Sequence, residues 1–256
     1  MDGPSAVMLL GAGLAGGVVT AMVGGSSLIT FPALLAAGLP PIVANASNTV
    51  ALTPGNFAGG LADLERMPRW DRSFLGLMAV AVVGSAAGAA LLLATPERAF
   101  TALVPLLIGF ATLLFALSNR IRARLAWGKD GGGHWTSGPV RLLLFAPVAV
   151  YGGYFGAGMS VMLLALLAMT LEADFRAINV LKNLLSGLTS LVAVVVFVSQ
   201  GVVAWLPVAV MMGGVLAGGF LGGRLVRVLP PRLLRSVVIT VGTVLTVVYA
   251  WRYWAS

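Results

Sequence analysis

The stretch Gly24-Gly25-Ser26-Ser27 interrupts a long apolar run near the start of the chain, and Gly156-Ala157-Gly158-Met159-Ser160 interrupts another in the second half. When the two stretches are aligned on their glycines, a serine of one also falls on a serine of the other. A glycine-rich break followed by serine therefore recurs at matching places about half a chain apart.

Asparagines downstream of the breaks extend this match. With a shift of one residue, Asn45 falls on Asn179 and Asn48 on Lys182. We interpret the chain as two repeats, residues 1–118 and 140–256, joined by a connecting loop at residues 119–139. Duplicated halves of this kind are typical of secondary transporters.

The composition indicates a polytopic membrane protein, since 59% of the residues are hydrophobic, 9% are charged and the mean hydropathy is +1.00. The first residues lack the basic flank of a signal peptide, so we expect every apolar run to be retained as a span. The chain has no cysteine, which excludes disulfides, thiolate metal sites and thiol nucleophiles. We predict neither a cofactor nor a bound metal.

The apolar runs are continuous and rich in Leu, Ala and Val, a pattern that favours membrane helices over a β-barrel. We predict an all-α protein with about eight transmembrane segments: residues 6–37, 42–61, 74–94, 100–117, 140–171, 177–199, 203–226 and 233–253. The first segment of each repeat is longer than the membrane core requires and contains the glycine-rich break, with proline nearby. Each of these two is expected to be a helix, a turn and a half-helix.

The breaks predict a binding site for an anion. Unpaired backbone deep in a membrane is tolerated only where protein or a water-filled cavity receives it. The N–H groups that open the following half-helix carry partial positive charge, which suits an anion. Most of the 33 glycines are better explained by close helix packing. Such packing glycines include Gly16, Gly17, Gly213, Gly214, Gly218, Gly219, Gly222 and Gly223.

Lys182 is the most unusual charge, because it lies within the apolar stretch 177–186. If its helix begins near Asp174, Lys182 lies about 12 Å along it, close to the membrane midplane. A buried ammonium needs a partner or a function. A later helix start would instead let the side chain extend to the interface.

Residues Asn179, Lys182, Asn183 and Ser186 follow the i, i+3, i+4, i+7 pattern and share one helix face. In the first half this pattern reads Asn45, Asn48, Thr49 and Leu52. The complete set of candidate substrate-binding residues is Gly24, Gly25, Ser26, Ser27, Asn45, Asn48, Thr49, Gly156, Gly158, Ser160, Asn179, Lys182, Asn183 and Ser186.

All eight acidic residues lie in predicted loops or at the ends of predicted segments, so no carboxylate is available as a buried proton relay. Hydroxyls, amides, backbone N–H groups and one ammonium remain, and together they suit a small oxyanion. An inside-negative potential favours expelling each negative charge by about 2.3 kcal/mol per 100 mV, so export needs no coupling ion. The net charge of +8 reflects arginines that face lipid head groups; nucleic-acid binding is not indicated.

The orientation depends on the basic clusters. Under the positive-inside rule, clusters at 66–72 and 120–141 are cytoplasmic, whereas eight spans put the cluster at 224–235 on the other side. A re-entrant hairpin at either break would change the number of membrane crossings and therefore the side that each cluster faces. Parallel and inverted repeats both remain open. The small residues of 213–223 favour internal packing or a homodimer, and we expect the dimer.

Two other function classes compete with transport. Lys182 and Ser186 are four residues apart on one helix, so they could form the Ser-Lys dyad of an intramembrane hydrolase, although no oxyanion hole is evident. Alternatively, the chain could be a membrane scaffold that transports nothing and whose glycines serve only packing.

Nearly the whole chain resembles the TauE/SafE sulfite-exporter family. The resemblance is carried by the duplicated breaks, by Leu-Pro-Pro-Ile-Val-Ala-Asn-Ala-Ser at 39–47, by Ala-Ile-Asn-Val-Leu-Lys at 177–182 and by Gly-Gly-Phe-Leu-Gly-Gly at 218–223. It implies a multi-pass permease of the bacterial inner membrane for sulfite, sulfoacetate or related anions. It points to Gly24, Gly25, Ser27, Gly156, Gly158, Asn179 and Lys182. Ser26 and Met159 depart from the unbroken glycine run that is commoner in that family.

Overall fold

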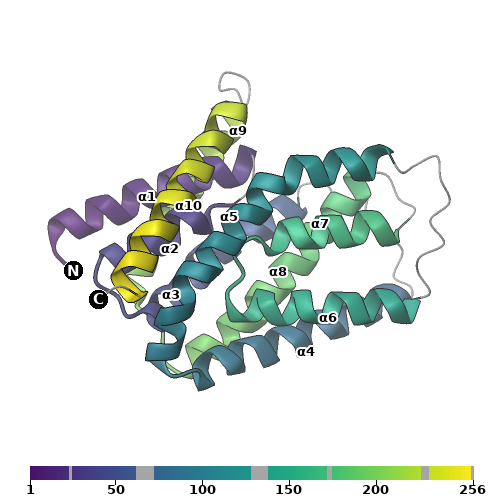
Figure 1. The fold of residues 1–256 in the computed structure, drawn as a ribbon, viewed down its shortest axis with the longest axis horizontal. Coiled ribbons are helices and arrows are strands. Elements are labelled where there is room, and N and C mark those ends of the chain that lie inside the picture. The colour runs from purple at the N-terminus through teal and green to yellow at the C-terminus, as the bar shows by residue number, and fades with distance from the viewer. Residues whose placement is uncertain (23–24, 62–71, 128–137, 172–174, 226–230, 255–256) are drawn as a thin grey trace.

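The computed structural model describes residues 1–22, 25–61, 72–127, 138–171, 175–225 and 231–254, and all secondary structure in these ranges is α-helical (Figure 1). The helices are α1 (Gly3–Met22), α2 (Ser27–Ala36), α3 (Pro41–Leu61), α4 (Arg72–Ala94), α5 (Glu97–Trp127), α6 (Gly138–Tyr154), α7 (Met159–Thr170), α8 (Phe175–Ser199), α9 (Trp205–Leu225) and α10 (Pro231–Trp254).

In the described ranges, six helices are long and apolar enough to cross a membrane, namely α1, α4, α5, α8, α9 and α10. This confirms an all-α polytopic membrane protein, whereas the count of eight segments is not confirmed. The structure also extends α5 to Trp127, so residues 119–127 are helical rather than part of the predicted connecting loop.

Both glycine-rich breaks interrupt the helices where the sequence predicts. The first separates α1 from α2, and the second separates α6 from α7. Gly25 has φ = 90° and Gly158 has φ = 83°, a left-handed conformation that side chains larger than glycine rarely adopt. The half-helices α2 and α7 therefore start just after positions whose backbone conformation suits glycine and few other residues.

The chain reverses at each break instead of continuing across the membrane. A Cβ atom added at Gly16 of α1 would lie 2.7 Å from Thr30 Cγ2 and 3.5 Å from Ser26 Cβ, so α2 folds back along α1. Figure 1 shows α7 returning in the direction opposite to α6. Each long apolar run is thus a helix, a turn and a half-helix, and the left-handed glycines turn the chain around.

Glycines mediate the closest helix contacts, as the packing interpretation predicts. A Cβ at Gly17 of α1 would overlap Val215 O of α9, and one at Gly88 of α4 would overlap Val150 O of α6. Gly214, Gly218 and Gly222 likewise contact the α1 backbone, whereas Gly213 and Gly219 have no atom within 4 Å of a Cβ position. Most of this small-residue face thus serves internal packing, and the homodimer stays a prediction.

The helix contacts of one half correspond to those of the other half when α1–α5 are matched in order with α6–α10. α1 packs on α9 as α6 packs on α4, and α2 packs on α10 as α7 packs on α5. The helices α3 and α8 pack on each other, as do α5 and α10. The last pair is antiparallel, since Trp254 Nε1 donates to Ala102 O at 3.0 Å while Arg235 Nη2 donates to Phe115 O at 2.8 Å.

Arg235 therefore lies beside the part of α5 that leads to Arg120. An eight-span arrangement would separate these two arginines across the membrane, and the six long apolar helices among the described residues do not confirm that arrangement. The N- and C-termini lie together at the opposite end of the molecule (Figure 1). The basic residues Arg66, Arg69, Lys129 and Arg227 lie outside the described residues.

Candidate functional site

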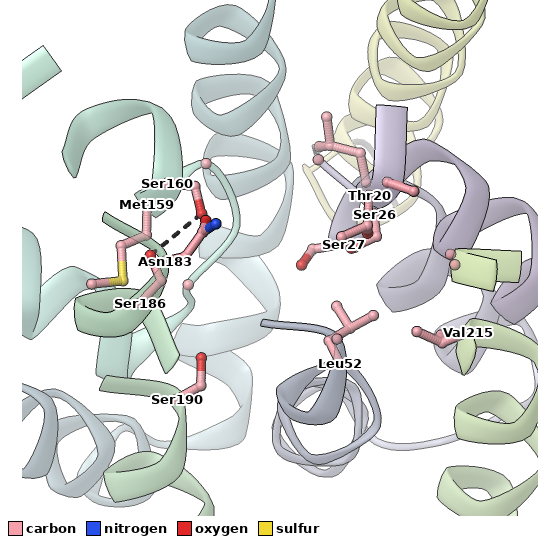
Figure 2. A pocket seen from close by; sticks show the side chains of 18 of the residues that line it. Thr20, Ser26, Ser27, Leu52, Met159, Ser160, Asn183, Ser186, Ser190 and Val215 are labelled. Carbon is pink, nitrogen blue, oxygen red and sulfur yellow. Dashed lines mark hydrogen bonds between the residues drawn. The ribbon is translucent and has the colours of Figure 1, made fainter. Parts of the chain in front are cut away.

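A cavity of about 630 Å³ lies where the two broken helix pairs meet (Figure 2). Both breaks line it, together with parts of α1, α3, α5, α8 and α9. The half-helix α2 approaches the second break directly, since the rings of Phe31 and Phe155 pack edge to face with centroids 5.3 Å apart. Segments far apart in the sequence thus enclose one space.

The structure gathers most of the candidate residues around this cavity. Those that line it are Gly25, Ser26, Ser27, Gly156, Gly158, Ser160, Asn179, Lys182, Asn183 and Ser186. Gly24 lies outside the described residues, and Asn45, Asn48 and Thr49 are not among the lining residues.

Both half-helices begin at the cavity. The carbonyl of Gly25 accepts from Leu28 N at 3.1 Å, and that of Gly158 accepts from Val161 N at 3.0 Å. Among the described residues, the Ser160 amide donates to no carbonyl of the preceding turn. Helix first turns leave such N–H groups available to a ligand, and their partial positive charge favours an anion.

The predicted face of α8 forms one wall of the cavity. α8 begins at Phe175, so Lys182 lies about 10 Å along the helix from its first residue. The Lys182 side chain is partly buried, and Ser186 Oγ lies 3.5 Å from Ser160 Oγ of α7. Ser190 also lines the cavity. Sequence reasoning missed Ser190, although it continues the same helical face one turn beyond Ser186.

Asn45, Asn48 and Thr49 do not line the cavity and make hydrogen bonds within the fold around it, while their predicted role as substrate ligands stays a prediction. Asn45 Nδ2 donates to Tyr154 O, the last residue of α6, at 2.9 Å. Asn48 Oδ1 accepts from Thr30 of α2, and Thr49 Oγ1 donates to Asn45 O at 3.0 Å. The two asparagines are 1% and 2% exposed. Their amides are used to fix the broken helix pairs against α3.

Several lining residues could not be found from the sequence. The first half contributes Thr20, and α9 adds Val215, Leu216 and Phe220, whereas Leu52, which also lines the cavity, is the first-half counterpart of Ser186 in the sequence pattern. No local pattern marks the α9 residues, because they reach the cavity only through the packing of α9 on α1.

Replacing Asn48 by alanine is expected to destabilise the protein by about 1 kcal/mol, because the buried Thr30 hydroxyl loses its side-chain acceptor and keeps only Ser26 O, at 3.1 Å. Thermal unfolding in detergent measures the effect. Ser27→Ala, which removes a partly buried hydroxyl that lines the cavity, is the control and should change the midpoint little. Equal stability of Asn48→Ala and the native protein would contradict the structural role.

Comparisons with known proteins agree on one family. Residues 9–249 match the family model described as sulfite exporter TauE/SafE. A protein of Haemophilus influenzae named probable membrane transporter protein is 28% identical over 247 residues, covering 91% of this chain and 90% of its own. The Escherichia coli probable membrane transporter protein YfcA is 26% identical over 235 residues, covering 90% of this chain and 84% of its own.

A third relative, from Sinorhizobium, is named probable membrane transporter protein ORF9 and is 28% identical over 237 residues, covering 90% of this chain and 87% of its own. No solved structure matches the chain. The relatives are transporters by name, which argues against the hydrolase alternative. The long apolar helices make this chain a multi-pass membrane protein. The chain belongs to the sulfite exporter TauE/SafE family of membrane transporters.

Proposed function

We propose that the protein exports small anions, such as sulfite, sulfoacetate or related sulfonates and organic anions, across the bacterial inner membrane. The observation that carries this proposal is the convergence of two half-helix N-termini and Lys182 on one cavity. Each N-terminus is equivalent to about half a positive charge, and the ammonium adds a full one. None of the described lining residues is acidic, so no fixed carboxylate repels an anion.

The membrane potential is the proposed driving force. An inside-negative potential favours outward movement of each negative charge by about 2.3 kcal/mol per 100 mV. The only ionisable side chain among the described lining residues is Lys182, so the cavity offers no carboxylate for proton coupling. Export therefore needs only the anion and the potential.

We further propose that the halves are inverted repeats. Exchange of the halves preserves the helix contacts and swaps α5 with α10, which run antiparallel. A two-fold axis that relates antiparallel helices is perpendicular to them and therefore lies in the membrane plane. Each half consists of a hairpin that returns to its starting side, followed by three crossings. Rocking of two such halves around a central site is a common way to alternate access.

The positive-inside rule assigns the cytoplasmic end. Arg235, near the start of α10, lies beside the part of α5 that leads to Arg120, and Arg141 lies near the start of α6. The last turns of α5 also carry Arg122 and Arg124, and the segments that join α3 to α4, α5 to α6 and α9 to α10 carry Arg66, Arg69, Lys129 and Arg227. We propose that this side is cytoplasmic and that both termini lie on the opposite side.

Cysteine labelling tests this topology, since the native chain has no cysteine. Arg120→Cys and Ser236→Cys are expected to react with a membrane-impermeant maleimide only from the cytoplasmic side. Glu97→Cys and Gln200→Cys should react only from the other side. Labelling of Ser236→Cys and Arg120→Cys from opposite sides would contradict the inverted arrangement.

Proteoliposomes that contain the purified protein test the transport proposal. An inside-positive potential of 100 mV should accumulate labelled sulfite and sulfoacetate up to about 50-fold for each negative charge at equilibrium, and reversing the potential should abolish accumulation. Ser186→Ala should slow the flux only several-fold, whereas a hydrolase would lose all activity. Folded protein that moves no anion at either potential would contradict the proposal and favour the scaffold alternative.

A further inference from the structure

One turn of α5 packs on both glycine-rich breaks. At the first break, a Cβ added at Gly25 would lie 2.9 Å from Cε2 of the Phe115 ring. At the second break, a Cβ at Gly158 would lie 3.3 Å from Leu114 Cδ1 and 3.4 Å from Ala111 Cα. Residues 111, 114 and 115 follow the i, i+3, i+4 spacing, so they share one face of the helix. This face of α5 therefore sets where α2 and α7 start relative to each other.

The positions of these two helix starts determine the anion site. Figure 2 shows Ser27 of the first break and Ser160 of the second on opposite sides of the cavity. The positive charge of a helix start falls off beyond its first turn, so its effect on an anion depends on where the helix begins. A displacement of either half-helix would weaken the site without changing any residue that lines it.

Arg235 of α10 holds this turn of α5 from outside the cavity. Its Nη2 atom donates to Phe115 O at 2.8 Å and to Ala116 O at 2.9 Å. Its guanidinium also lies over the Phe115 ring, with Cζ 5.5 Å from the ring centroid. Phe115 is buried and lines the cavity, whereas Arg235 is half-buried and is not among the lining residues. Arg235 thus contacts both the backbone and the ring of the residue that packs on Gly25.

The two kinds of contact together require the shape of a guanidinium. This group is planar, carries several N–H donors in a fixed geometry and stacks on aromatic rings. Its hydrogen bonds to the two carbonyls are charge-assisted, which makes them roughly twice as strong as neutral ones. A lysine ammonium at this place would keep the charge but lack the planar fork. Arg235 therefore restrains both the α5 backbone and the orientation of the Phe115 ring.

We propose that Arg235 is a positioning residue for the anion site, which acts through Phe115 to fix the start of α2 at Gly25. The inference rests on the proposed anion transport and adds to it a residue that does not touch the substrate. Without Arg235, Phe115 and α2 would occupy several positions, and only one of them completes the site. Apparent affinity falls by the fraction of time that the competent position is occupied. A bound anion selects that position, so the maximal rate per folded molecule should change little.

The half-saturating concentrations of sulfite and sulfoacetate test the inference. Proteoliposomes on a solid-supported membrane electrode report the charge moved as the anion concentration rises. Arg235→Gln is expected to raise half-saturation about tenfold, as for a competent position occupied about one tenth of the time, and to change the maximal current per folded protein less than about twofold. A purely structural role would lower the amount of folded protein and leave half-saturation unchanged. That result would overturn the inference.

Arg235→Lys separates positioning from charge, and it decides the question if Arg235→Gln does not fold. Loss of the stacked guanidinium should leave half-saturation raised about threefold. Complete rescue by lysine would show that charge alone is needed and would overturn the positioning role.

Arg252→Gln is the matched control on the same helix. Arg252 is exposed in the last turn of α10, and its guanidinium lies over Tyr253 with Cζ 5.9 Å from the ring centroid. Removing this charge at the other end of α10 should leave half-saturation within about twofold of the native value.

A double variant tests the route through Phe115. Phe115→Leu removes the ring but keeps an apolar side chain, and it should itself raise half-saturation. If Arg235 acts through Phe115, combining Phe115→Leu with Arg235→Gln should raise half-saturation by clearly less than the product of the two single effects. Single effects that multiply would overturn this route.

The experiment separates the two proposals. Native currents together with unchanged half-saturation in Arg235→Gln would overturn the positioning role alone, because anion transport would still be present. Absence of current with both anions in the native protein would overturn the transport proposal and the positioning role with it.

Discussion

Lys182→Ala is expected to lower potential-driven anion uptake by about 100-fold, which corresponds to about 2.7 kcal/mol of lost stabilisation along the transport path. Lys182 is the only cationic side chain that lines the cavity within the described residues. A charge-assisted hydrogen bond to an oxyanion is roughly twice as strong as a neutral one, and no neighbouring side chain can replace it. Lys182→Arg keeps the charge and should retain part of the activity.

The control is Arg98→Gln, which removes an exposed positive charge at the start of α5, away from the cavity. Its uptake should match the native protein within about twofold, as expected for a screened surface charge. Thermal unfolding must show that Lys182→Ala still folds. Native uptake rates in folded Lys182→Ala would show that the cavity assignment is wrong.

Gly17→Leu is expected to prevent correct folding, with a cost above about 3 kcal/mol. A Cβ at Gly17 would overlap Val215 O and lie 2.7 Å from Gly219 N, so α1 and α9 would have to separate. Backbone atoms on the opposing helix cannot rotate away as a side chain can. The yield of monodisperse protein in detergent gel filtration measures the loss.

Gly11→Leu is the matched control on the same helix, because no atom lies within 4 Å of a Cβ at Gly11. It should express and elute like the native protein. Equal yields for Gly17→Leu and Gly11→Leu would contradict the contact between α1 and α9 and, with it, the position of α9 beside the cavity.

Local signals account for what the sequence predicts well. Gly25 and Gly158 mark the helix breaks because only glycine readily adopts their positive φ. The spacing of Lys182, Asn183 and Ser186 follows helical periodicity, so their common face is predictable without tertiary information. All three line the cavity in the structure.

Tertiary contacts decide the rest. A glycine-rich break looks the same whether the chain continues or turns back, so the reversal of α2 along α1 is not visible in the sequence. The sequence pattern pairs Asn45 with Asn179, yet Asn45 bonds to Tyr154 O, a carbonyl 109 residues away, and does not line the cavity. The direction of the chain and the use of each amide therefore depend on packing between the halves.

Bromine anomalous scattering from protein crystals soaked in 2-bromoethanesulfonate tests the central claim most directly, namely that an anion binds where the two breaks meet. The chain has no cysteine for this bromide to alkylate. The account predicts a bromine peak inside the cavity between the two breaks, with sulfonate density facing Ser160 and Lys182. Bromine peaks elsewhere, with an empty cavity at a saturating concentration, would contradict it.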